Sequence, residues 1–239
     1  MMKIKLISFD LWNTLIIYNK NSIRKKMRIN YILEIIKHYK DVTYEDVENA
    51  YEEAYNELDR IWMMSSRTPP PEEYLEILGS ILGIKFSSRE IKDITDFIQK
   101  TVTDIPPGLM KGAKKILDEL SKKYTLALIS NTGITIGDTL RKILKMKGIL
   151  KNFSLTLFSN ETIYGKPHPV VFEKLLNYFN VSPENVIHIG DNEYADIVGA
   201  KNAGMYTILF TKNKNEKTTA DFTIKSLYEI PEKLKVLYL

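Results

Sequence analysis

An aspartate directly after the first apolar run is the residue best placed to do chemistry. Residues 3–9 predict a buried strand, and Asp10 follows it in the run Asp-Leu-Trp-Asn-Thr. Ligands of open α/β sheets gather beyond the carboxyl ends of the strands. A charge beside buried apolar residues is costly unless it is paired or bound to a metal. Asp10 is therefore a candidate nucleophile or metal ligand; the simpler alternative is an aspartate that only ends a strand.

Two further segments carry polar groups suited to an anion. Ser130 and Asn131 follow the predicted strand Thr125–Ile129, where a hydroxyl, an amide and flexible backbone N–H groups favour an anion cradle. Lys166 lies in the run Gly-Lys-Pro-His-Pro, whose prolines would hold its ammonium group in place. Each also has an ordinary explanation: a polar loop for the first segment and a solvated surface lysine for the second.

A pair of carboxylates follows another predicted strand. Asp191 and Asp196 flank a turn after Val186–Ile189, in the run Gly-Asp-Asn-Glu-Tyr-Ala-Asp. Such carboxylates suit Mg²⁺, which takes a few protein oxygens and keeps several waters. Glu193 is a further candidate ligand, although a solvated loop carboxylate is the simpler interpretation.

The order of these four segments resembles the haloacid dehalogenase-like hydrolase superfamily. That family's pattern is an apolar strand followed by D-x-D-x-T, a strand followed by S/T-N, a K-P segment, and a strand followed by G-D and a further Asp. The resemblance covers roughly residues 1–20 and 104–239, and the run 190–205 fits it especially closely. It implies a hydrolase whose mobile helical cap closes over the site and selects substrates.

The resemblance also implies roles for individual residues. Asp10 would be the nucleophile that attacks phosphorus and forms an aspartyl-phosphate. Ser130 and the Asn131 backbone would hold the phosphoryl oxygens, with Thr14 supporting the loop. Lys166 would neutralise charge on the nucleophile and the phosphate. The expected partner is a small anionic, phosphorylated substrate.

A Mg²⁺ site is part of the same resemblance. The ion would lie between the carboxylates of Asp10 and Asp191 and the main-chain carbonyl of Trp12, shielding the nucleophile from the phosphate. Asp196 would be a supporting ligand. Because Trp12 would contribute only its backbone carbonyl, the indole side chain at this position does not argue against Mg²⁺ binding.

Trp12 is nevertheless where the sequence departs from the family pattern. Phosphatases of this family carry an aspartate there, which protonates the leaving group and then activates water. An indole has no proton to give at neutral pH. Without a substitute for the aspartate, the reaction would lose the rate enhancement of about 10²–10⁴-fold that general acid–base catalysis supplies. The side chain of Trp12 could instead line the substrate pocket.

Three hypotheses fit this departure. The first is a phosphatase with an undemanding leaving group, or with a substitute acid or base such as Glu193 or a cap residue. The second is a dehalogenase-like enzyme that attacks carbon; that branch works without metal and replaces the G-D aspartate, so the retained Asp191 argues against it. The third is a non-catalytic binding protein, against which the retained Asp10 and Lys166 argue. The phosphatase hypothesis is favoured.

The hydrophobic pattern predicts the elements that position these residues. Short β-branched runs alternate with amphipathic segments, as in a parallel sheet covered by helices. The predicted strands are Lys3–Phe9, Thr125–Ile129, Leu155–Phe158, Val186–Ile189, Tyr206–Phe210 and Phe222–Ile224. The predicted helices are Lys111–Lys123, Ile136–Lys147, Pro169–Phe179 and Asp196–Ala203. The expected fold is α/β: a Rossmann-like, three-layer α/β/α core with an inserted α-helical cap.

Residues 21–103 contain no convincing strand and predict that cap, between core segments 1–20 and 104–239. Thr43 and Ser87 begin capping boxes, and Pro69–Pro71 divides the block into two helical pairs. Apolar stripes at helical spacing are expected to face inward; they are Ile23, Met27, Tyr31, Ile35 and Tyr39, and then Val47, Tyr51, Ala54, Leu58 and Ile61. Four basic residues near the block's start favour a solvated helix face over contact with an anionic substrate; they are Arg24, Lys25, Lys26 and Arg28.

Composition narrows the function classes. The 239 residues include no cysteine and only three scattered histidines, so any metal should be a hard cation held by oxygen. A net charge of +4 suits an anionic small molecule, is too weak for nucleic-acid binding, and is also explained by a lysine-rich source organism. No apolar segment reaches the roughly 18–20 residues of a membrane span. We therefore expect a cytoplasmic monomer or homodimer.

Overall fold

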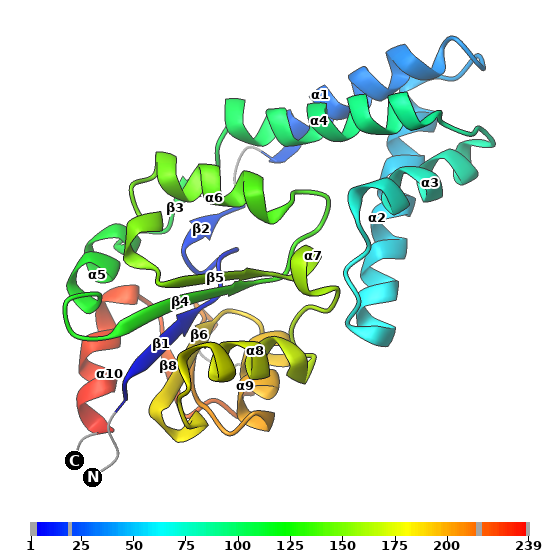
Figure 1. Cartoon of the computed structure of the whole chain (residues 1–239). Helices are drawn as coiled ribbons and strands as arrows, with labels where there is room; N and C mark the ends of the chain where they lie inside the picture. Colours follow the sequence, from blue (N-terminus) through cyan, green and yellow to red (C-terminus); the bar gives the residue numbers. More distant parts are fainter. Residues whose placement is uncertain (1–3, 19–20, 214–216, 238–239) are drawn as a thin grey trace.

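A six-stranded parallel sheet forms the centre of the protein in the computed structural model, which describes residues 4–18, 21–213 and 217–237 (Figure 1). The strand order is β5-β4-β1-β6-β7-β8. The strands are β1 (Leu6–Phe9), β4 (Thr125–Ser130), β5 (Leu155–Phe158), β6 (Val186–Gly190), β7 (Tyr206–Phe210) and β8 (Phe222–Ile224). The order places β1 between β4 and β6, so the three strands that precede predicted site residues are neighbours.

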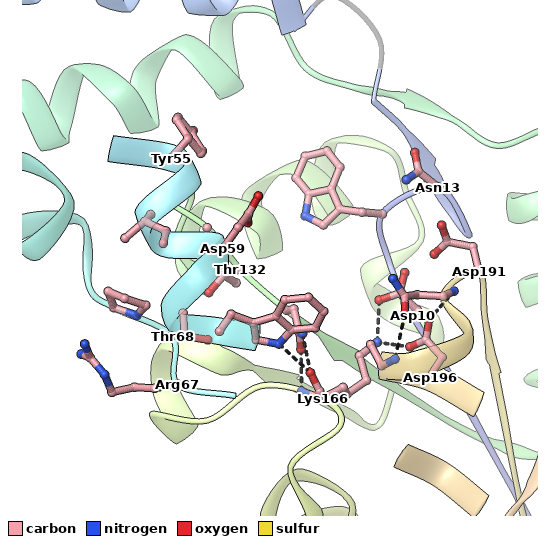
Figure 2. Close-up of a pocket in the computed structure, with 18 residues that line it drawn as sticks. Asp10, Asn13, Tyr55, Asp59, Arg67, Thr68, Thr132, Lys166, Asp191 and Asp196 are labelled. Carbon is pink, nitrogen blue, oxygen red and sulfur yellow. Dashed lines mark hydrogen bonds and ion pairs between the residues drawn. The ribbon is translucent and has the colours of Figure 1, made fainter. Parts of the chain in front are cut away.

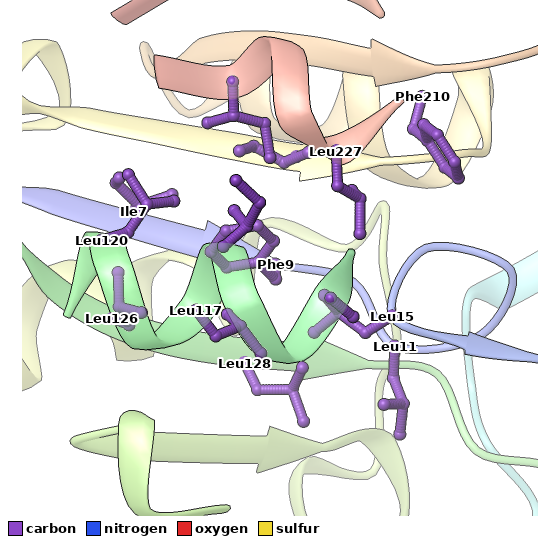
Figure 3. Close-up of a cluster of buried hydrophobic side chains, with 14 of the residues drawn as sticks. Ile7, Phe9, Leu11, Leu15, Leu117, Leu120, Leu126, Leu128, Phe210 and Leu227 are labelled. Carbon is purple, nitrogen blue, oxygen red and sulfur yellow. The ribbon is translucent and has the colours of Figure 1, made fainter. Parts of the chain in front are cut away.

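Helices cover both faces of this sheet (Figure 1). They are α5 (Ala113–Leu120), α6 (Gly137–Met146), α7 (Ser159–Thr162), α8 (Pro169–Phe179), α9 (Gly199–Asn202) and α10 (Ile230–Val236). Side chains of α5, α6 and α10 pack on one face together with Ile7 and Phe9 of β1. Figure 3 shows Leu117 and Leu120 of α5 in this cluster. Side chains of α8 and α9 pack on the other face with Leu6. The predicted three-layer α/β/α core is confirmed.

The predicted boundaries are close to those observed. β5, β7, β8 and α8 have the predicted ends. β1 begins at Leu6, after Ile4 and Lys5, and the predicted start at Lys3 lies outside the described residues. The predicted helix Asp196–Ala203 is instead a π-helical segment, Glu193–Val198, that continues into α9. Such π-helical turns are rare and occur frequently at functional sites. Short 3₁₀ turns complete the core, at Leu150–Asn152, Pro183–Asn185 and Leu227–Glu229.

A two-stranded antiparallel ribbon that the sequence reading missed joins the core to the helical block. Its strands are β2 (Ile16–Ile17) and β3 (Gly108–Leu109), which pair Ile16 with Leu109. The chain therefore leaves the core and returns to it at the same place. Two-residue strands are too short to produce an alternating hydrophobic pattern, which explains why they were not predicted.

The helical block has its own hydrophobic core. It consists of α1 (Asn21–Ile36), α2 (Tyr44–Ser65), α3 (Pro71–Leu82) and α4 (Ser88–Asp104), and Figure 1 shows it standing to one side of the sheet. Both predicted capping boxes are present: Thr43 with Asp46 before α2, and Ser87 with Glu90 before α4. We refer to α1–α4 as the helical insert.

One of the two predicted apolar stripes is buried as expected, and the other lies only at the edge of the insert's core. On α2, Val47, Tyr51, Ala54 and Leu58 are buried as predicted, while Ile61 is half-buried. On α1, Ile23 is exposed and Met27, Tyr31 and Ile35 are half-buried, while Tyr39 lies beyond the end of the helix and is exposed. The fully buried side chains of α1 are instead Arg24, Arg28, Ile29, Ile32 and Ile36. Both stripes of α1 have helical spacing, so local periodicity does not distinguish them. Packing of α1 against α4 and α2 decides between them.

None of the helices in the described ranges is long and apolar enough to cross a membrane.

Candidate active site

The carboxyl ends of β1, β4 and β6 bring the predicted site residues to one edge of the sheet. Asp10 still belongs to the ladder, because its backbone N–H donates to the carbonyl of Ile189 at 2.8 Å. Asp191 directly follows β6, and Ser130 is the last residue of β4. Parallel strands end at a common edge, so residues far apart in the sequence meet there.

Lys166 links two of the carboxylates. Its Nζ lies 2.6 Å from Asp10 Oδ1 and 2.6 Å from Asp196 Oδ1. It also donates to the carbonyl of Ile129 at 2.8 Å, and only 1% of its side chain is exposed. All three protons of the ammonium group are thus directed at acceptors. The explanation of Lys166 as a solvated surface charge is wrong.

Burial controls how these groups ionise. Desolvation raises the pKa of Asp10 to about 7, with Asp196 and Asp191 adding to the effect and Lys166 opposing it. Desolvation and the charge of Asp196 raise the pKa of Asp191 to about 6. Burial would raise the pKa of Asp196 too, but Lys166 and His188 outweigh it and hold that pKa low. Burial would lower the pKa of Lys166, but Asp10 and Asp196 raise it instead. The site therefore favours a bound cation near Asp10 and Asp191.

Asp196 is held by a buried chain of side chains. Its Oδ1 lies 3.1 Å from His188 Nε2, and His188 Nδ1 lies 2.8 Å from the hydroxyl of Ser8. Its Oδ2 accepts from the backbone N–H of Asn192 at 3.0 Å. A Cβ at position 190 would collide with the Asp196 carboxyl, so glycine is required there. The sequence reading missed His188, although a histidine within a buried strand signals that it needs a polar partner.

Three carboxylates form a site suited to a divalent cation. Asp10, Asp191 and Asp196 each offer an oxygen, and these oxygens lie within 4.8 Å of one another. Thr14, fully buried, donates weakly to Asp191 Oδ1 at 3.5 Å. Oxygen ligands of this number and charge suit Mg²⁺. The donor set fits the ion, whose positive charge would lower the raised pKa values of Asp10 and Asp191.

Asn131 acts on Lys166 through its side chain. Its Nδ2 donates to the carbonyl of Lys166 at 2.8 Å, and its Oδ1 accepts from the backbone N–H of Lys166 at 2.7 Å. A Cβ at Gly165 would come within 2.6 Å of Asn131 Oδ1, so glycine permits this close approach. Ser130 is buried and its hydroxyl donates to the carbonyl of Asn131 at 3.2 Å. The structure thus brings these three predicted residues together.

A cavity of about 310 Å³ opens above these groups, between the core and the helical insert (Figure 2). Its core wall contains Asp10, Trp12, Asn131, Lys166 and Asp191, which places the side chain of Trp12 at the pocket as predicted. Its other wall comes from the insert and contains Tyr55, Leu58, Asp59, Trp62 and Arg67 to Pro69. None of these insert residues was predicted as a site residue, because their roles depend on how the insert sits on the core.

The insert is attached to the core beside Lys166. Trp62 Nε1 donates to the Lys166 carbonyl at 2.8 Å, and its ring packs edge-on against Tyr194 with centroids 6.0 Å apart. The backbone N–H of Gly165 donates to the carbonyl of Ser66 at 2.7 Å. The end of α2 therefore touches both loops that carry the site's charged residues.

Glu193 faces away from this cavity. Its carboxylate accepts hydrogen bonds from the Thr218 hydroxyl at 2.6 Å and the Thr219 backbone at 2.8 Å. Burial would raise the pKa of Glu193, but these hydrogen bonds outweigh it and lower the pKa. The residue supports a neighbouring loop, so it supplies neither the missing acid or base nor a ligand to the three-carboxylate site.

Two of the four basic residues near the start of α1 are buried, which corrects the expectation of a solvated face. Arg24 and Arg28 are 2% and 4% exposed, and they line a cavity of about 280 Å³ that shares Trp12 with the first one. Arg28 donates to the Thr101 hydroxyl at 2.8 Å. Lys25 pairs with glutamates of α2, and Lys26 is exposed.

Comparison with known proteins gives the class of protein. A family model described as haloacid dehalogenase-like hydrolase matches residues 4–204. A glyceraldehyde 3-phosphate phosphatase of Pyrococcus furiosus is 32% identical over 99% of this chain and 94% of its own length.

Solved structures show the same fold. A 2-haloacid dehalogenase from Pseudomonas syringae is similar with a TM-score of 0.73 and 20% identity, covering 99% of this chain and 100% of that one. A magnesium-bound HAD-hydrolase from Bacillus subtilis gives a TM-score of 0.67 and 19% identity, covering 97% and 99% of the two chains. The chain belongs to the haloacid dehalogenase-like hydrolase family, and the resemblance that the motifs predicted is confirmed.

Proposed function

We propose that this hydrolase is a Mg²⁺-dependent phosphatase of a small phosphorylated metabolite, working through an aspartyl-phosphate at Asp10. The observation that carries the proposal is the buried pairing of Asp10 with Lys166, with Asp191 and Asp196 close enough to share a cation. The relative from Pyrococcus furiosus, a named phosphatase that matches nearly the whole chain, supports the same reaction class.

The charges of the site suit attack on phosphorus. The Asp10 carboxylate bonds to phosphorus as the ester oxygen departs, and Lys166, 2.6 Å from Asp10, balances negative charge on both the nucleophile and the phosphoryl group. In this proposal the backbone of Asn131, which lines the cavity, binds a phosphoryl oxygen, and the hydroxyl of Ser130 turns from the Asn131 carbonyl to bind another. Thr14 supports the loop after β1. Water then releases phosphate and restores Asp10.

The residues that would hold Mg²⁺ are Asp10, Asp191, the main-chain carbonyl of Trp12 and, as support, Asp196. When bound, the ion supplies Lewis-acid stabilisation of charge on the phosphoryl oxygens. Residues 1–20 and 104–239 form the catalytic domain in this proposal. Residues 21–103 are a cap that covers the site, excludes water and contacts the substrate beyond its phosphate.

Hydrolysis of p-nitrophenyl phosphate tests the proposal. We expect Mg²⁺-dependent release of p-nitrophenolate, abolished by EDTA and reduced by at least about 10⁴-fold in Asp10→Asn, because the covalent route is lost. Asp41→Asn is the matched control, since Asp41 is exposed and lies outside this cavity. Activity that survives EDTA, or halide release from 2-haloacids, would instead support a dehalogenase. Phosphate binding without turnover of either substrate class would support a non-catalytic protein.

A further inference from the structure

The reaction lacks an identified proton donor. Trp12 occupies the place of the family's acid–base aspartate, and Glu193 is bonded to the 218–219 loop outside the cavity. Within the described residues, the cavity wall contains four carboxylates: Asp10, Asp59, Asp191 and Asp196. Three of these form the nucleophile and cation site. Asp59, which lies on the insert, is the remaining acid.

Asp59 belongs to a face of α2 that is directed at the cavity. Tyr55, Leu58, Asp59 and Trp62 all line it, and their spacing places them on one side of a helix. Figure 2 shows Asp59 pointing from α2 into the space opposite Asp10. No hydrogen bond or ion pair holds its carboxylate among the residues that the structure describes, whereas Arg67 in the same wall is paired with Glu73.

The side of the cavity on which Asp59 lies is the side of the leaving group. Displacement at phosphorus places the attacking and departing oxygens roughly in line. Asp10 attacks from the core, so the departing oxygen faces the insert. Trp62 comes three residues after Asp59, and its hydrogen bond to the Lys166 carbonyl at 2.8 Å fixes this turn of α2 beside the catalytic loop.

The surroundings of Asp59 shift the pKa of its carboxyl upward, the direction that favours proton donation. Although Asp59 is exposed to the cavity, the neighbouring walls partly desolvate its carboxyl, and this desolvation raises the pKa from its ordinary value. The charged and titratable groups that share the adjoining cavity are Tyr18, Arg24, Arg28 and Tyr55. Of these, Arg28 already donates to Thr101, Tyr51 and the Ile98 carbonyl, so it is held within the insert.

We propose that Asp59 is the general acid and base of this reaction; the proposal rests on the phosphatase activity proposed above. As the Asp10–phosphorus bond forms and the ester P–O bond breaks, the Asp59 carboxyl proton passes to the departing oxygen. The Asp59 carboxylate then takes a proton from water while the water oxygen bonds to phosphorus and the Asp10–phosphorus bond breaks. Phosphate leaves, and both aspartates return to their starting states.

First-turnover kinetics of two aryl phosphates test this role in Asp59→Asn. The p-nitrophenolate leaving group needs little protonation, so its first turnover should change by no more than about threefold, while that of phenyl phosphate falls about 10²-fold or more. The Asp59→Asn substitution also removes the base that would activate water for hydrolysis of the aspartyl-phosphate. The variant should therefore release a burst of one p-nitrophenolate per active site, followed by slow turnover.

Control and rescue variants make the result specific. Glu53→Gln removes an exposed carboxylate of the same helix that does not line this cavity and should leave both substrates unchanged. Trp12→Asp in the Asp59→Asn background should restore phenyl phosphate hydrolysis, because it returns a carboxyl to the family's usual position. Thermal unfolding checks that each variant folds.

Three outcomes overturn the proposal. The first is an equal fall of the first-turnover rate on both substrates in Asp59→Asn, and the second is no fall on either substrate. The third is a wild-type enzyme whose own first-turnover rate is already much lower for phenyl phosphate than for p-nitrophenyl phosphate. A wild-type enzyme that hydrolyses neither ester refutes the phosphatase activity itself. That result is distinguishable from a failure of Asp59 alone.

Discussion

Lys166 of the core and Asp59 of the helical insert face the same cavity, but their charged groups are held in opposite ways. In the core, Lys166 is 1% exposed and bound to Asp10, Asp196 and a backbone carbonyl. In the insert, Asp59 faces the same cavity with no ion-pair partner in the described part of the chain. The charges of the core site are thus already paired within the protein, and the insert presents a carboxylate that our proposal assigns to proton transfer.

This difference has an energetic consequence. Removing one member of a buried charge network leaves the others unpaired in a medium of low polarity. Removing an exposed carboxylate leaves no buried charge unpaired. Core substitutions should therefore damage stability and activity together, and insert substitutions that do not touch the core should separate them.

The largest effect is expected for Lys166→Met. Asp10 and Asp196 would remain buried without their cation, which costs about 3–5 kcal/mol of unfolding free energy, and phosphatase activity should be lost. Urea denaturation and p-nitrophenyl phosphate hydrolysis measure the two effects. Lys174→Met, an exposed lysine on α8, is the control and should change neither. A stability loss below about 1 kcal/mol would show that the network is not what holds this edge of the sheet.

Mg²⁺ should stabilise the protein through the three-carboxylate site. An ion present at 100 times its dissociation constant adds about 2.7 kcal/mol to the free energy of unfolding. Asp191→Asn should remove most of this gain, because Asp191 is one of three carboxylates whose oxygens lie within 4.8 Å of one another. Thermal unfolding with and without Mg²⁺ measures it, with Asp41→Asn as the control that keeps the full gain. Equal gains in both variants would place the ion elsewhere.

Trp62→Phe tests the contact between the two regions. The substitution removes the hydrogen bond from Trp62 to the Lys166 carbonyl and should cost about 0.5–1.5 kcal/mol of stability. Because Asn131 still donates to that carbonyl, the core should stay intact while kcat/KM falls several-fold. Urea denaturation and steady-state kinetics give the two values. An unchanged kcat/KM would show that the position of Lys166 does not depend on the insert.

The smallest effect is expected at the start of α4. Ser87→Ala removes a capping-box acceptor of the Glu90 backbone N–H and should cost about 1 kcal/mol with no change in kcat. Ser88→Ala, the next residue along, is the matched control and should cost less. A change in kcat would mean that insert stability and catalysis are coupled at a distance from the cavity, which would weaken the contrast between the two regions.

Much of the fold was predictable because its signals are local. Tyr206–Phe210 and Phe222–Ile224 are short runs of mainly aromatic and β-branched residues, and each forms a strand with those ends. The capping boxes at Thr43 and Ser87 depend on residues three positions apart. The inward face of α1 was not predictable, since two overlapping stripes have helical spacing and only α2 and α4 select one.

The site was predictable to the extent that it lies at strand ends. Asp10, Ser130 and Asp191 follow β1, β4 and β6 or end them, and neighbouring parallel strands bring their ends together. His188 and Trp62 were missed because their partners, Asp196 and the Lys166 carbonyl, come from other segments. Glu193 shows that closeness in sequence is not enough. It lies near Asp191 in the chain, yet its carboxylate accepts a hydrogen bond from Thr218 outside the cavity.

By itself, the sequence determined the α/β core, the helical insert and the family, because alternation, caps and motif order are properties of neighbouring residues. Only the tertiary structure decided which charges are buried together and which remain open to the cavity. Pairing of Lys166 with Asp10 and Asp196, and the exposure of Asp59 opposite them, depend on contacts between segments that are distant in the chain. Desolvation and ion pairing act through space, so the residue type and its neighbours in sequence do not reveal them.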